Sequence, residues 1–138
     1  MRTHTLRGRV DASTTKRLVV DDGRFTNVMK VTDFYVWSEA LASGDDPECL
    51  LAKNLEIGPG VADASNGNQI AWSGMRVSST SVGPYSIVDP DHLIISDLYI
   101  SNISAATANY MVVLQEDTIT EDEAVLQLIK ERAQDDLR

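Results

Sequence analysis

The chain has 138 residues, of which 43% are hydrophobic and 24% are charged, and this balance is typical of one globular domain rather than of a disordered segment. Its 12 Lys and Arg face 21 Asp and Glu, a formal net charge of −9, which argues against a protein that binds duplex nucleic acid through a basic face. The longest apolar run, Tyr110–Leu114, is far shorter than the roughly 20 residues of a membrane helix. We expect no secretory signal, because the first residues lack an apolar stretch, and no intrachain disulfide, because Cys49 is the single cysteine.

Segments rich in β-branched and aromatic residues, separated by turn residues, predict about seven short strands. In Ile94–Ile100, the apolar residues 94, 98 and 100 fall on one face of a strand and Asp97 falls on the other. This is the spacing of a strand with one buried face. The expected strands are Thr3–Val10, Thr15–Asp21, Asn27–Trp37, Cys49–Ile57, Gln69–Val77, Ile94–Ile100 and Asn109–Glu116, with a short extended piece between Gly83 and Asp91. They predict a mainly β fold, an antiparallel and jelly-roll-like β-sandwich.

One α-helix is expected at the C-terminus, over residues 118–138. Thr120 and Glu123 have the spacing of a capping box. Apolar residues follow at helical spacing and form one stripe: Val125, Leu128, Ile129 and Ala133. This stripe packs either on the sandwich or on a neighbouring subunit, and the sequence leaves both open. The single domain is therefore divided into an N-terminal arm or first strand (1–14), a sandwich (15–117) and this helix.

Charge is distributed unevenly along the chain. Residues 1–30 carry a net charge of +4, residues 31–114 carry −8 and residues 115–138 carry −5. The asymmetry is either chance or a sign of head-to-tail electrostatic matching between protomers, or of a basic arm that docks on an acidic shell. The interface candidates are Arg2, Arg7 and Arg9 in the arm and Val125, Leu128 and Ile129 in the helix.

The sequence contains no nucleophile elbow, no phosphate loop and no zinc-ligand spacing, so we expect no catalytic site and no cofactor. Weak candidates for a metal site are Asp89, Asp91 and His92, two carboxylates and an imidazole within four residues. The alternative interpretation is a proline turn whose Asp side chains bind nearby backbone amides. Cys49 precedes two leucines and is expected to be a small buried residue rather than a nucleophile.

The aromatic residues raise the question of ligand stacking. Trp37 and Trp72 lie inside apolar stretches, where packing in the core is the common outcome. Tyr85 follows Gly83-Pro84 and is the best candidate for an exposed ring that stacks on a sugar.

Several segments carry a resemblance to a known class of proteins. They are Arg17–Thr26, Lys30–Trp37, Gln69–Trp72, Ser86–Ile100, which contains Val88-Asp89-Pro90-Asp91, and Asn109–Leu114. Together they resemble small virion proteins of tailed phages, particularly phages of marine bacteria. The resemblance implies a structural protein with no active site to carry over, and the C-terminal helix is not part of the shared pattern.

From this resemblance we expect a non-enzymatic virion protein, in first place a capsid decoration (cement) protein that binds at capsid subunit junctions in a particle assembled in the host cytoplasm. The expected partners are the major capsid protein or other virion proteins and further copies of the chain, as a dimer or trimer, without nucleic acid or membrane. Two alternatives stay open: a neck, tail or fibre-attachment protein that contacts host glycans, and a small hydrolase built on paired carboxylates. A shallow groove floored by an aromatic residue would favour glycan binding, whereas an uncovered C-terminal stripe would favour assembly.

Overall fold

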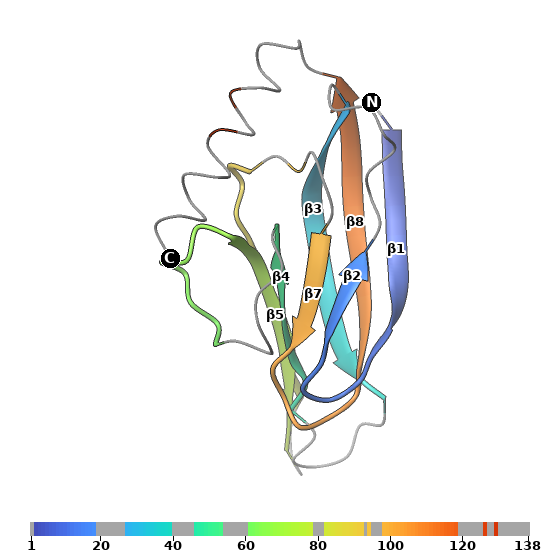
Figure 1. Ribbon diagram of the computed structural model, residues 1–138. Helices are drawn as coiled ribbons and strands as arrows, with labels where there is room; N and C mark the ends of the chain where they lie inside the picture. Colours follow the sequence, from blue (N-terminus) through green and yellow to red (C-terminus); the bar gives the residue numbers. More distant parts are fainter. Residues whose placement is uncertain are drawn as a thin grey trace.

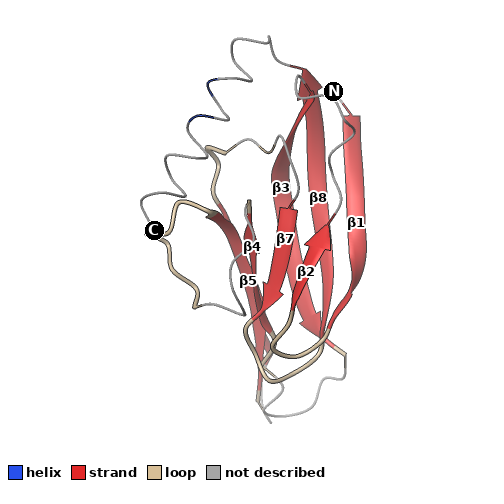
Figure 2. Ribbon diagram, viewed as in Figure 1, coloured by secondary structure: helices blue, strands red, loops and turns tan. Residues whose placement is uncertain are grey.

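A computed structural model describes residues 2–18, 27–39, 46–53, 61–78, 82–92, 94, 98–118, 126 and 129. Within this part of the chain, eight β-strands form the fold (Figures 1 and 2). They are β1 (Arg2–Val10), β2 (Thr15–Leu18), β3 (Asn27–Ser38), β4 (Glu48–Ala52), β5 (Gln69–Val77), β6 (Val82–Val88), β7 (Leu98–Asn102) and β8 (Ala108–Thr118).

The strands form two antiparallel sheets. One has three strands in the order β1-β8-β3, and the other has five in the order β2-β7-β4-β5-β6. Strand β1 lies beside β2 on one flank, and β3 lies beside β6 and β5 on the other. The predicted mainly β, antiparallel fold is confirmed, and the two-layer arrangement in Figure 1 is consistent with a sandwich.

The core lies between the two sheets. Inward-facing side chains of both sheets are fully buried there together with Ile94, which precedes β7; the largest of the strand residues are Phe34, Leu51, Ile70, Leu98, Ile100, Val31, Val112 and Leu114. Cys49 is buried as predicted, and burial, followed by the charge of Glu48, raises the pKa of its thiol to about 12. The thiol is therefore protonated at neutral pH, the less reactive form of a cysteine.

Strand β3 corrects one prediction. Phe34 and Val36 are buried, whereas Tyr35 and Trp37 are 44% and 38% exposed. The expectation that Trp37 packs in the core is wrong, because successive side chains of a strand point to opposite faces and this strand is covered on one face only. Trp72 is partly buried, and its indole N–H donates to Gln69 Oε1 at 2.9 Å.

Two element boundaries also differ from the predictions. The extended piece before Asp89 is the full strand β6. Of the predicted strand Ile94–Ile100, Ile94 forms an isolated bridge with Met29 and β7 covers the part from Leu98, whereas residues 95–97 lie outside the described residues. Strand β4 ends at Ala52, and residues 54–57 of the predicted strand Cys49–Ile57 lie outside the described residues.

The predicted C-terminal helix lies outside the described residues, apart from Leu126 and Ile129, so it stays a prediction. The side chains of these two residues are 60% and 58% exposed. Val125 and Leu128 also lie outside the described residues. In the described part of the chain, no helix has the length and apolar character needed to cross a membrane.

Replacing Phe34, which is fully buried between the sheets, tests the packing. We expect Phe34→Ala to lower the free energy of unfolding by about 3–5 kcal/mol, because the truncation leaves a cavity. The matched control is Ile87→Thr on β6, at an exposed position, where about 0.5 kcal/mol or less is expected. Urea denaturation of both variants measures the difference, and equal losses would contradict the placement of Phe34.

Candidate functional site

A groove of about 350 Å³ opens on the flank where β3 lies beside β6. Side chains of three strands line it, namely Tyr35, Val36 and Trp37 of β3, Ser73 and Met75 of β5, and Pro84, Tyr85 and Ser86 of β6. A second hollow of about 320 Å³ adjoins it through Met75 and Tyr85 and adds the carboxylates of Asp46 and Glu48. Apolar and aromatic walls with a few polar groups are typical of ligand-binding sites.

Tyr35 is tethered on one wall of the groove. Its hydroxyl donates to Asp33 Oδ1 at 3.2 Å. The negative charge of Asp33, together with this hydrogen bond, raises the pKa of Tyr35, so the phenol stays protonated and keeps donating. The carboxylate of Asp33 is thereby fixed next to an exposed aromatic face.

Tyr85 is held more tightly on the other wall. Its ring lies over Gly74, where an added Cβ would sit 2.8 Å from the Tyr85 hydroxyl oxygen and 2.7 Å from the Pro47 carbonyl oxygen. Only glycine at position 74 therefore leaves room for the ring. Burial, followed by the charge of Glu48 and a hydrogen bond to it, raises the pKa of Tyr85 to about 12. The ring is still 41% exposed, which agrees with the prediction of exposure.

Two serines connect the walls of the groove. The Ser86 hydroxyl donates to the Phe34 carbonyl and joins β6 to β3, and the Ser73 hydroxyl donates to the Tyr85 carbonyl at 2.9 Å. Hydrogen bonds thus connect the strands that carry the aromatic rings. The surface available to a ligand is therefore preformed.

The two carboxylates of the second hollow serve as structural acceptors. Asp46 Oδ1 accepts the Val77 amide at 2.9 Å, and its Oδ2 lies 3.9 Å from Arg76 Nε. Glu48 binds the Tyr85 hydroxyl. Both carboxylates are thus engaged in contacts that position neighbouring groups.

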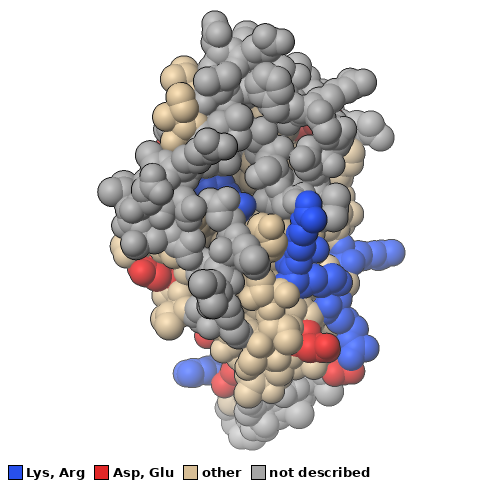
Figure 3. Space-filling view, viewed as in Figure 1, with Lys and Arg blue, Asp and Glu red and all other residues tan. Residues whose placement is uncertain are grey.

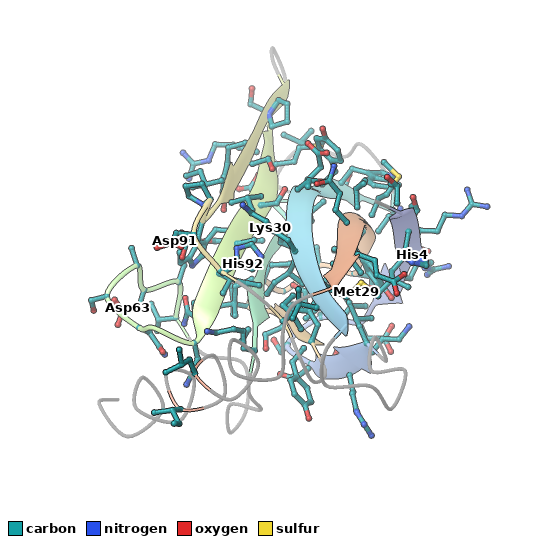
Figure 4. The ribbon with its side chains drawn as sticks, turned by 90° about the horizontal axis from the view of Figure 1, so that it is seen from above. His4, Met29, Lys30, Asp63, Asp91 and His92 are labelled. Carbon is teal, nitrogen blue, oxygen red and sulfur yellow. The ribbon has the colours of Figure 1, made fainter. Side chains whose placement is uncertain are left out.

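The weak metal candidates form a turn. Asp89 Oδ1 accepts the Asp91 amide at 2.9 Å, and His92 bonds through Nδ1 to the Asp89 carbonyl at 2.6 Å. His92 Nε2 accepts the Val31 amide of β3 at 3.0 Å, and Figure 4 shows the ring beside Lys30. Because Nδ1 faces a carbonyl oxygen and Nε2 accepts an amide hydrogen, the ring proton is assigned to Nδ1. Both ring nitrogens are therefore occupied.

A metal ion would have to displace one of these bonds to His92. Among the described residues, no group of three or more His, Cys, Asp or Glu side chains could hold a metal ion. The geometry therefore fits the proline-turn interpretation, with His92 as a buried clamp between β3 and the segment after β6.

The basic interface candidates lie on β1. Arg7 and Arg9 point to the exposed face of the three-stranded sheet, and Arg9 Nη2 pairs with Glu39 Oε1 at 2.7 Å. Arg2 belongs to the same strand, but its side chain lies outside the described residues. Figure 3 shows Lys and Arg gathered over the β1–β2 flank, where β2 adds Lys16 and Arg17.

Sequence reasoning found Tyr85 but missed Tyr35 and Trp37. The signal that could have found them is the strict alternation Phe34-Tyr35-Val36-Trp37, since one face of a strand in a three-stranded sheet can remain open. The chain matches no family model, no curated protein and no solved structure. The function is therefore inferred from the groove, the charged flanks and the resemblance.

The buried imidazole of His92 predicts a pH dependence of stability. Burial lowers its pKa below the usual 6.5, the charges of Lys30 and Lys53 add to this, and the hydrogen bond to Asp89 and the charge of Asp89 oppose it. His92 therefore binds a proton more readily in the unfolded chain than in the folded chain. As a result, the free energy of unfolding falls as the pH drops below about 6.5. The slope from one proton is at most about 1.4 kcal/mol per pH unit.

Urea denaturation between pH 7.5 and 5 measures this decline, and His92→Gln should reduce it because glutamine does not titrate. The control is His4→Gln, which removes the other histidine and should preserve it. An unchanged pH dependence in His92→Gln would show that His92 is not the responsible group.

Proposed function

We propose that this chain is a non-enzymatic structural protein of a phage virion, which acts as a capsid decoration protein at junctions between capsid subunits. The resemblance of the segments within residues 17–116 to small virion proteins of tailed phages supports this proposal. The strand orders β1-β8-β3 and β2-β7-β4-β5, with β6 lying between β5 and β3, also support a jelly-roll topology, an architecture common in capsid proteins.

The observation that carries the proposal is the chemical difference between the two flanks. Among the described residues, the β1–β2 flank exposes four cations and the carboxylates Asp11 and Glu39; the cations are Arg7, Arg9, Lys16 and Arg17. The groove flank carries three carboxylates, with Arg76 as the nearby cation; the carboxylates are Asp33, Asp46 and Glu48.

Because the flanks lie at opposite edges of both sheets, one protomer can contact two different neighbours at once. A protein that bridges two subunits in this way strengthens their junction. Many copies on a symmetric shell add their modest contacts, so none of the patches has to be strongly apolar. The net charge of −9 keeps the chain soluble and limits non-specific association.

The composition of purified particles tests this proposal. Quantitative mass spectrometry of the phage that encodes the chain should find it in a copy number comparable to that of the major capsid protein. Its absence from the particles would contradict the virion assignment, and a few copies per particle would place it at a neck or tail instead.

Binding to particles that lack the chain tests the flank itself. Lys16→Glu combined with Arg17→Glu should weaken co-sedimentation with such capsids at least tenfold, because it reverses two exposed charges of β2. The control pair Lys16→Arg and Arg17→Lys keeps the charges and should bind like the native chain. Equal binding of both pairs would exclude the basic flank as a contact surface.

The aromatic groove favours a second candidate function, a neck, tail or fibre-attachment protein that contacts host glycans. Tyr35, Trp37 and Tyr85 expose ring faces on which a pyranose ring can stack. Carboxylate and hydroxyl oxygens beside the rings can accept hydrogen bonds from sugar hydroxyls.

A glycan array followed by NMR titration tests this second function. Tyr85→Ala should abolish binding of any saccharide found, because it removes the ring shared by both hollows. The control Ile87→Thr changes an exposed residue of the same strand that does not line either hollow, so binding should persist. Saccharide binding that survives in Tyr85→Ala would exclude the groove as its site.

A further inference from the structure

The outer face of the three-stranded sheet has an ordered pattern of side chains. The registers of β1 and β3 with the central strand β8 align residues of the three strands in rows. Those rows are Thr5–Val113–Asp33, Arg7–Met111–Tyr35 and Arg9–Asn109–Trp37. The face is therefore basic along β1, largely apolar along β8, and aromatic and acidic along β3.

This face is accessible in the single chain. Thr5, Arg7 and Arg9 are exposed on β1, and Tyr35 and Trp37 are exposed on β3. The side chains of Met111, Val113 and Asn109 on β8 are partly exposed. The neighbouring residues that alternate with them point into the core, so this surface takes no part in the packing between the two sheets.

The order of the three strands makes the face self-complementary. A two-fold axis that runs along β8, in the plane of contact, places β1 of one copy opposite β3 of the other. Arg7 of each copy then lies against Tyr35 of the other copy, next to the Asp33 carboxylate that the Tyr35 hydroxyl holds at 3.2 Å. A guanidinium stacks on an aromatic ring and pairs with a carboxylate at the same time.

The central strand completes this arrangement. Because the axis follows β8, Met111 and Val113 face the same residues of the second copy and form an apolar centre between two charged margins. An apolar centre with a polar rim that contains Arg and Tyr is the usual composition of a protein interface.

We propose that the outer face of the β1-β8-β3 sheet is the contact surface of a symmetric homodimer, and that a second copy of this chain occupies it. The charge complementarity between β1 and β3 is what selects a second copy. This inference goes beyond the virion function, since the contact needs no other protein. The dimer contact does not involve β2 or β6, so the surfaces around Lys16 and Tyr85 stay outside it.

The size of the face sets the expected affinity. Three strands spaced about 4.8 Å apart and nine residues long cover roughly 14 by 30 Å, or about 400 Å² per copy. A standard interface buries about 800 Å² per partner. We therefore expect a weak dimer, with a dissociation constant of roughly 10 μM to 1 mM, strong enough to matter where copies are concentrated on a surface.

Sedimentation velocity of the full chain, from about 10 μM to 1 mM, tests the proposal. The native chain should shift from monomer to dimer as its concentration rises. Arg7→Glu should weaken dimerisation at least tenfold, because it places like charges at both margins. Arg7→Glu combined with Asp33→Arg should restore the dimer, because the exchanged charges again face each other. The control Lys16→Glu reverses a charge on β2, outside the face, and should dimerise like the native chain.

A cross-linking measurement keeps the test decisive if Asp33→Arg disturbs the fold. Met111→Cys should form a covalent dimer with a short bismaleimide, because only residues near a two-fold axis face their own equivalents. The control Lys16→Cys should not, and the buried Cys49 does not interfere. A native chain that stays monomeric over the whole range would overturn the proposal. So would a dimer that Arg7→Glu leaves unchanged, or one that Met111→Cys does not trap.

Discussion

The period-two alternation of β3 after its bulge between Val31 and Asp33 is the constraint on which the rest of the structure depends. Phe34 and Val36 enter the core, and the same backbone geometry forces Tyr35 and Trp37 outward. A shift of one residue in the pairing of β3 with β8 would reverse both faces. The burial of Phe34 therefore fixes the exposure of the two aromatic rings, and the core and the binding surfaces are decided together.

Two different surfaces follow from this one strand. Along its edge, β3 meets β6 and forms the groove, in which Tyr85 has its place because Gly74 leaves room for the ring. On its outer face, β3 forms one margin of the sheet whose other margin is Arg7 on β1. The proposed virion role needs several contact surfaces on one body, and this arrangement supplies two of them.

The sequence was sufficient for most of the strands and for their antiparallel class, because alternation and turn residues act locally, but it did not predict β6 as a full strand. It misplaced Trp37, since residue type suggests burial but only the width of the sheet determines which face is covered. It could not find that Arg7, Met111 and Tyr35 lie in one row, which depends on the register of three strands far apart in the chain. The role of His92 was ambiguous for the same reason, because the amide that donates to its Nε2 belongs to Val31 on a distant strand. The virion function, the partners and the C-terminal helix stay predictions.

The accessibility of Trp37 tests most directly whether this molecule works through the outward face of β3. Trp72→Phe leaves Trp37 as the single tryptophan, and acrylamide quenching of its fluorescence measures its exposure. The account predicts strong quenching in dilute solution and progressive protection as the protein concentration rises and copies cover the face. Protection already in dilute solution would place Trp37 in the core, and quenching that never changes with concentration would show that no second copy covers it.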